Sequence, residues 1–181
     1  MREPYRGVRP ARVAASLPTS FTPSTQEITM ALEIGTEAPD FTLANSDGEE
    51  VTLSQFRGQP VYLNFYPLAF SPVCTDWFTA IAADGSPYEG AVVIGVSVDS
   101  KWTLAAFKEQ MKANNVHFLA DFHPKGAVAQ AYDVYLDQAG ISGRCTYVID
   151  ANGVIVDVDQ VAPLETPDAD RLIAALGACK A

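Results

Sequence analysis

Residues 61–74 read Val-Tyr-Leu-Asn-Phe-Tyr-Pro-Leu-Ala-Phe-Ser-Pro-Val-Cys, and this stretch decides the fold. Its first six residues are strongly apolar and predict a buried strand that ends at Pro67. A helical stretch begins around Pro72 and is broken by Gly85, Ser86 and Pro87. Cys74 is therefore expected in the first turn of a helix that follows a core strand.

Further elements are expected on both sides of this stretch. They are a short hairpin over 41–53, a strand over 91–98, helices over 101–114, 126–132 and 167–176, and a late hairpin over 145–158. The strand over 91–98 has no polar alternation, as expected where both faces of a strand are covered. Two strand–helix units require a parallel pair, whereas the late hairpin is antiparallel. The order predicts an α/β fold that resembles the thioredoxin-like architecture: a mixed sheet flanked by helices on both faces, with an N-terminal hairpin.

Length and composition allow one domain with a sizeable core, since 48% of the 181 residues are hydrophobic. We expect residues 1–29, which carry four prolines and no regular period, to be a flexible extension, and residues 30–181 to form the domain. A transit peptide and a natural start at Met30 are both open as explanations of the extension.

Charge, hydropathy and cysteine usage exclude several classes of partner. From Met30 onward, eight basic residues stand against 20 acidic ones, so that neither nucleic acid nor an anionic membrane is an expected partner. No apolar run approaches the roughly 20 residues that cross a bilayer. Three widely spaced cysteines indicate a reducing compartment, and the cytoplasm is the expected location. With no Cys-x-x-Cys and no paired histidines, we expect no metal and no cofactor.

The spacing of Pro67, Ser71 and Cys74 matches the pattern Pro-x-x-x-Thr/Ser-x-x-Cys. This pattern resembles that of the peroxiredoxins, the AhpC/TSA superfamily. The resemblance covers roughly residues 32–160 and extends to the segments 95–100, 121–129 and 143–150. The last two segments are most similar to the one-cysteine, AhpE-like group.

The resemblance implies a thiol-dependent peroxidase that reduces hydrogen peroxide and organic hydroperoxides through a sulfenic acid on Cys74. An external thiol, or a thioredoxin- or mycoredoxin-like protein, would regenerate the thiol, and the chain would form a homodimer or a higher oligomer. The preferred peroxide and the physiological reductant stay open.

The chemistry of the residues agrees with this implication. Only a thiolate attacks peroxide oxygen, and a helix N-terminus favours the charged form of Cys74. The family supplies an arginine that matches Arg144, a hydroxyl that matches Ser71, and a proline, here Pro67, that shields the thiolate. Main-chain N–H groups near Val73 and Cys74, together with Arg144, would bind the substrate and stabilise charge on the leaving oxygen.

The other two cysteines have weaker grounds for a role in the chemistry. Cys145 adjoins Arg144 on a strand, so that its side chain points to the opposite face and packs in the core. Cys179 lies near the chain end and is either inert or a resolving thiol. An external reductant is the favoured hypothesis for regeneration.

Two positions depart from the family pattern. Ser71 stands where threonine is usual, which keeps the hydroxyl. Trp77 stands where the family commonly has a glutamate that orients the arginine. Loss of this carboxylate predicts that Arg144 is held less well and that peroxide reduction is slower. On this reasoning, Trp77→Glu would speed the reaction. The same loss also favours the alternative of a catalytically weakened peroxiredoxin that serves as a redox sensor or chaperone.

Overall fold

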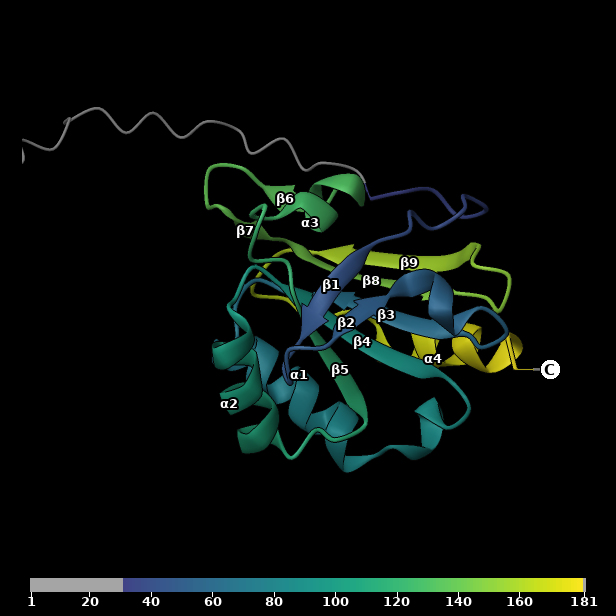
Figure 1. The fold of residues 1–181 in the computed structure, drawn as a ribbon. Coiled ribbons are helices and arrows are strands. Elements are labelled where there is room, and N and C mark those ends of the chain that lie inside the picture. Colours follow the sequence, from purple (N-terminus) through teal and green to yellow (C-terminus); the bar gives the residue numbers. More distant parts are fainter. Residues whose placement is uncertain (1–30, 181) are drawn as a thin grey trace, which may run out of the picture.

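The computed structural model describes residues 31–180, so the extension expected over 1–29 lies outside the described residues. Seven strands form the main sheet: β1 (Thr42–Asn45), β2 (Glu50–Thr52), β3 (Val61–Phe65), β4 (Val92–Ser97), β5 (Val116–Ala120), β8 (Arg144–Ile149) and β9 (Ile155–Val161). Their order is β2-β1-β5-β4-β3-β8-β9 (Figure 1). β3 therefore lies inside the sheet, between β4 and β8.

Helices cover the two faces of this sheet unequally. Three of them, α1 (Pro72–Ala83), α2 (Lys101–Met111) and α4 (Ala169–Ala178), bury their apolar residues in one core cluster on one face. The short α3 (Ala127–Ala131) contributes to the other cluster, beside a small hairpin of β6 (Tyr135–Leu136) and β7 (Ile141–Ser142) (Figure 1). Two single-turn helices, η1 (Leu53–Phe56) and η2 (Ser86–Tyr88), complete the elements. Within residues 31–180, no helix has the length and apolar character needed to span a membrane.

The predicted mixed sheet and its two hairpins are confirmed. β3 pairs with β4 in parallel across α1, and β4 pairs with β5 in parallel across α2. The N-terminal hairpin of β1 and β2 and the late hairpin of β8 and β9 are antiparallel. β3 and β8 are also antiparallel, with Phe65 opposite Cys145. This pairing brings the end of β3 next to the beginning of β8.

One strand of the sheet, β5, was missing from the sequence prediction. The helix expected to reach residue 114 ends at Met111, because Lys112 takes a left-handed conformation with φ of 53° and stops it. β5 begins four residues after Lys112 and includes the exposed His117. This polar residue interrupts the apolar run that would have indicated a buried strand. β1 joins the sheet by pairing with β5, so the N-terminal hairpin depends on a strand that the pattern did not reveal.

A group of aromatic rings holds α1 against the sheet. Phe78 of α1 packs on Tyr66 and on Phe118, with ring centroids 4.8 and 4.9 Å apart. Phe107 of α2 adds edge contacts to Phe78 and Phe118 at 6.0 and 5.4 Å. Beneath these rings lies Gly95 of β4, and the space that a side chain would occupy there is taken by the rings of Phe78 and Phe118.

We predict that Gly95→Ala destabilises the fold, because the added methyl would lie 2.9 Å from Cζ of Phe78 and 3.1 Å from Cδ1 of Phe118. Overpacking of this kind costs about 1–3 kcal/mol of unfolding free energy, which urea unfolding would measure. Gly85→Ala is the matched control, since its methyl would meet only the Asn115 amide, at 3.7 Å. Equal stability of the two variants would contradict the prediction.

Candidate active site

Cys74 is the third residue of α1, and Ser71 is the N-cap of this helix. The Cys74 side chain is fully buried, whereas Ser71 and Val73 in the same turn are partly exposed. The sulfur therefore lies close beneath the surface, at the end of the helix where main-chain N–H groups lack helical partners.

The first turn of α1 leaves these N–H groups available. Pro72 has no N–H, and the N–H groups of Val73 and Cys74 form no hydrogen bond within residues 31–180. The Ser71 hydroxyl forms no capping bond to the helix, so it too is available to a ligand. Free N–H donors at a helix N-terminus favour an anion or a partly negative oxygen at this position.

Arg144 places its guanidinium directly on the sulfur. It is the first residue of β8, only 3% exposed, and its Nη2 donates to Cys74 Sγ at 3.3 Å. The two residues are 70 positions apart in the chain, and the antiparallel pairing of β3 with β8 brings them together. A cation at this distance stabilises a thiolate relative to the neutral thiol.

The guanidinium is oriented by a main-chain oxygen. Arg144 Nε and Nη2 donate to the Pro163 carbonyl at 3.2 and 2.9 Å. No carboxylate of residues 31–180 forms an ion pair with Arg144, and its Nη1 group forms no hydrogen bond with them. The missing glutamate therefore does not leave Arg144 without an acceptor, since the Pro163 carbonyl supplies one.

The loop between β3 and α1 is fixed by contacts that sequence reasoning missed. Pro67 is buried, and the N–H of Ala69 donates to the Asp99 carboxylate at 2.8 Å. The Ser97 hydroxyl donates to the same carboxylate at 2.9 Å. Asp99 belongs to the segment 95–100 that carried the family resemblance, but nothing local in that segment indicates which loop it contacts.

Phe70 directly precedes the N-cap in a left-handed conformation, with φ of 64°. Non-glycine residues rarely adopt this conformation, and they keep it where neighbouring contacts hold it. The Phe70 ring packs edge-on against Phe107, with centroids 5.2 Å apart, although 44% of the side chain is exposed. The contact secures the turn that leads into α1.

A buried polar network joins α1 to the two central strands. Asn64 of β3 accepts at Oδ1 from Trp77 Nε1 and from Thr146 Oγ1, both at 3.1 Å. Its Nδ2 donates to the carbonyls of Tyr62 and Ile94, both at 3.2 Å, so both polar groups of the amide are paired. Trp77 follows Cys74 by one helical turn, and Thr146 follows Arg144 by two residues on one face of β8. The network thus keeps the sulfur and the guanidinium in register.

The other two cysteines lie away from this site. Cys145 packs in the cluster on the opposite face of the sheet, as predicted, and burial raises its pKa to about 12. Cys179 is the C-cap residue of α4 and lies beside the turn at Asp150. Partial burial raises the pKa of its thiol. That turn follows the last residue of β8, and five residue steps of a strand span about 17 Å. Cys74 and Cys179 therefore lie toward opposite ends of the sheet.

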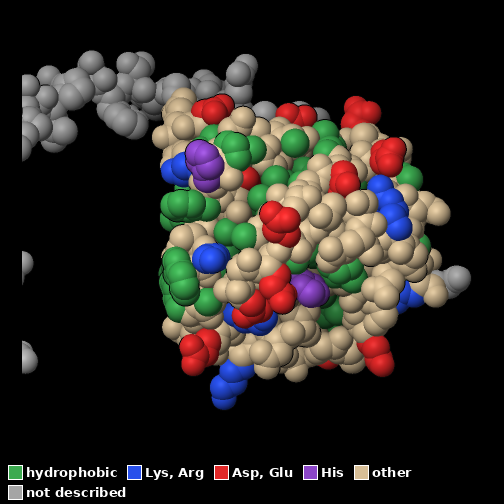
Figure 2. Space-filling model, in the orientation of Figure 1, with side chains coloured by type: hydrophobic (Ala, Val, Ile, Leu, Met, Phe, Trp, Pro, Cys, Tyr) green, Lys and Arg blue, Asp and Glu red, His purple; other side chains and the backbone are tan. Residues whose placement is uncertain are grey.

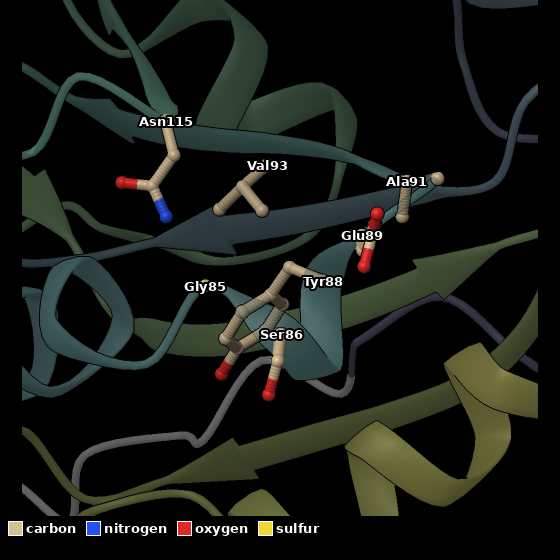
Figure 3. A pocket seen from close by; sticks show the side chains of 8 residues that line it. Gly85, Ser86, Tyr88, Glu89, Ala91, Val93 and Asn115 are labelled. Atoms are coloured by element: carbon tan, nitrogen blue, oxygen red, sulfur yellow. The ribbon is translucent and has the colours of Figure 1, made fainter.

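Other surface features add no reactive group to this site. An open hollow of about 330 Å³ lies between η2 and β4, and Figure 3 shows Tyr88, Ser86 and Asn115 in its lining, which includes no cysteine and no basic side chain. No group of three His, Cys, Asp or Glu within 31–180 has the geometry of a metal site. On the face in Figure 2, basic side chains stand singly among acidic ones, in keeping with the acidic composition.

Comparisons with known proteins agree with these features. The AhpC/TSA family model matches residues 34–158. Alkyl hydroperoxide reductase E of Mycobacterium tuberculosis is 36% identical over 140 residues, covering 76% of this chain and 91% of the relative. Peroxiredoxin-2 of Mus musculus is 37% identical over 134 residues, covering 68% of this chain and 67% of the relative. The crystal structure of peroxidoxin BcpB from M. tuberculosis superposes with a TM-score of 0.73 at 28% identity, covering 83% of this chain and 99% of that one.

We predict that Trp77→Glu leaves the chain folded but speeds no reaction with peroxide, contrary to the expectation from the family pattern alone. The substitution removes the donor to Asn64 Oδ1 and places a carboxylate near it, while Arg144 already has its acceptor. Urea unfolding should show a loss of about 1–3 kcal/mol. Trp77→Phe, which also removes the indole N–H but adds no charge, is the control. A glutamate variant faster than the parent chain would overturn this prediction.

Proposed function

Because the chain belongs to the AhpC/TSA family of peroxiredoxins and is a thiol-dependent peroxidase, we propose that Cys74 is the residue that reduces the hydroperoxide. The observation that carries this proposal is the contact of 3.3 Å between Arg144 Nη2 and Cys74 Sγ at the N-terminus of α1. A cation and a helix N-terminus both favour the thiolate, which is the reactive form.

In the oxidative half of the reaction, the Cys74 thiolate attacks the terminal oxygen of the hydroperoxide. A sulfur–oxygen bond forms as the oxygen–oxygen bond breaks, so that sulfur loses two electrons and the peroxide gains them. The leaving oxygen takes up a proton. The products are a sulfenic acid on Cys74 and an alcohol, or water when hydrogen peroxide is the substrate.

The proposed substrate contacts follow from the donors that the protein leaves unused. The N–H groups of Val73 and Cys74 and the Nη1 group of Arg144 can receive the peroxide oxygens and the charge that develops on the leaving oxygen. The Ser71 hydroxyl can accept from the peroxide O–H and donate to the sulfur. Pro67, buried beneath the loop, limits access of water to the thiolate.

In the reductive half, we propose an external thiol or a thioredoxin- or mycoredoxin-like protein as the reductant. One thiol condenses with the sulfenic acid, which releases water and forms a mixed disulfide with Cys74. A second thiol then attacks this disulfide and frees Cys74. The position of Cys179 supports an external source, because a disulfide requires Cα atoms within about 7 Å of each other.

A cytoplasmic location and a homodimer or higher oligomer are further parts of the proposal. All three cysteines are free thiols, as suits a reducing compartment. Trp102 and Phe122 are 76% and 58% exposed and line one open hollow, and a second copy of the chain would cover such apolar surface.

The alternative of a weakened peroxiredoxin that acts as a sensor or chaperone depended on Trp77. This ground is removed by the hydrogen bonds from Arg144 to the Pro163 carbonyl, since they orient the guanidinium without the glutamate. Sustained peroxide turnover with excess reductant is the result expected of an enzyme rather than of a sensor.

We predict that Cys74→Ser abolishes peroxide turnover, whereas Cys145→Ser and Cys179→Ser keep most of it. Only Cys74 combines a helix N-terminus with a cation, while the buried Cys145 stays protonated at neutral pH. Peroxide consumption at saturating dithiothreitol would measure the three variants side by side. An equal loss of rate in all three would refute the assignment.

We also predict that one equivalent of peroxide gives a sulfenic acid on Cys74 and no disulfide within the chain. The sulfenic acid adds 16 Da, one oxygen atom, whereas a disulfide removes two hydrogen atoms, so intact-mass analysis distinguishes the two. Peptide mapping under non-reducing conditions would locate any bridge. A dominant species joining Cys74 to Cys179 would place the protein among the two-cysteine enzymes instead.

A further inference from the structure

The Pro163 carbonyl accepts two hydrogen bonds from Arg144, from Nε at 3.2 Å and from Nη2 at 2.9 Å. The same Nη2 donates its other hydrogen to Cys74 Sγ at 3.3 Å. One oxygen atom thus holds the edge of the guanidinium that also touches the sulfur. Rotation of the guanidinium about its long axis would break both contacts with Pro163 and displace the group from the sulfur.

The Pro163 carbonyl carries no net charge, unlike a carboxylate, and this difference between the two acceptors matters for catalysis. A carboxylate in the same place would orient the guanidinium and also cancel much of its field at the sulfur. A carbonyl orients it through its dipole and leaves the full positive charge to act on the thiolate. It also leaves Nη1 without a partner among residues 31–180, and so open to substrate oxygen.

We infer that Pro163 is a positioning residue of this peroxidase, and that its main-chain carbonyl sets the Arg144 guanidinium against the Cys74 sulfur. The inference rests on the proposed role of Cys74. It extends that role to a turn whose side chains form no hydrogen bond with the Cys74 sulfur.

The carbonyl owes its place to a short, exposed turn after β9. Val161, the last residue of β9, lies opposite Arg144 in the sheet, and Pro163 follows two residues later. Two hydrogen bonds close the turn: Glu165 N donates to the Ala162 carbonyl at 2.9 Å, and Ala162 N donates to Glu165 Oε2 at 3.3 Å. Leu164 at its tip is 85% exposed, so little packing holds the turn from outside.

With so little packing, the restricted φ of proline becomes a main determinant of where the carbonyl points. Pro163→Gly frees this angle and keeps the carbonyl, so that the same oxygen samples many more orientations. The fold should survive, because the residue is exposed and its side chain belongs to neither core cluster.

The chain offers a matched control in Pro87. This proline also lies in a turn, in η2, and its carbonyl also accepts from a cationic side chain, Lys180 Nζ at 2.9 Å. Pro87 is away from the site, because η2 follows the C-terminal end of α1 whereas Cys74 lies in the first turn of that helix. Pro87→Gly therefore frees φ at another residue whose carbonyl accepts from a cationic side chain, and it leaves the contacts of Arg144 unchanged.

The experiment compares Pro163→Gly with Pro87→Gly in three readouts: the rate constant for peroxide in stopped flow, the thiolate fraction at pH 7 from ultraviolet absorbance, and the midpoint of thermal unfolding. We expect Pro163→Gly to lower the rate constant about 10-fold, as misplacement of a catalytic group does, and to lower the thiolate fraction. Pro87→Gly should leave both unchanged. Pro163→Ala, which restricts φ more than glycine does, should recover part of the loss.

A double-mutant cycle with Arg144→Gln tests whether the effect passes through the arginine. Arg144→Gln alone should slow the reaction by about 10²-fold, comparable to the loss of one preorganised donor. Pro163→Gly should then add nothing further, because no guanidinium is left to position. Additive losses in rate would overturn the inference, as would a folded Pro163→Gly chain with the rate and thiolate fraction of the parent.

Two further outcomes are separable from these. If Pro163→Gly fails to fold, Glu165→Gln takes its place, because it weakens a hydrogen bond that closes the same turn. An unchanged rate constant and thiolate fraction in Glu165→Gln would also overturn the inference. Activity that survives Cys74→Ser would instead refute the proposed function itself. Loss of activity in Cys74→Ser, with equal rates for Pro163→Gly and Pro87→Gly, would refute only the role of Pro163.

Discussion

The hydrogen bond from Arg144 to the Cys74 sulfur joins two residues 70 positions apart, and the rest of the site is arranged around it. It exists because β3 ends where β8 begins: α1 starts just after β3 and carries the sulfur, while Arg144 opens β8. A buried guanidinium is costly unless it has a partner and its donors are used. The Cys74 sulfur and the Pro163 carbonyl supply partners for Nη2 and Nε, while Nη1 is without a partner among residues 31–180.

The same pairing separates the reactive cysteine from an inert one. Successive residues of β8 point to opposite faces, so Arg144 reaches α1 while Cys145 packs among aromatic rings on the other side. On the face of the sheet that carries Cys74, Asn64 accepts hydrogen bonds from Trp77 of α1 and from Thr146 of β8, and so holds the helix against the strand. A one-residue slip of β8 would exchange the two faces and replace the cation beside Cys74 with a thiol.

Orientation by a carbonyl instead of a carboxylate also changes the electrostatics of the site. The helix N-terminus contributes a partial positive charge, and Arg144 contributes a full one that no carboxylate of residues 31–180 neutralises. Both act on a sulfur that is fully buried, where screening by water is weak. Trp77 is therefore compatible with an active peroxidase, and its indole supports the network through Asn64.

The sequence alone determined the strand over 61–66, the helix that begins near Pro72, and the register of Pro67, Ser71 and Cys74, because these features depend on neighbours within a few residues. The pairing of Arg144 with Cys74 was expected only through family resemblance. β5, Asn64 and Asp99 were missed, and so was the Pro163 carbonyl. Each of them acts through a partner distant in sequence: Asn64 and Thr146, for example, are 82 positions apart. A main-chain carbonyl also has no side-chain signature, so only the tertiary structure, which brings the turn after β9 back over Arg144, decided what holds the arginine.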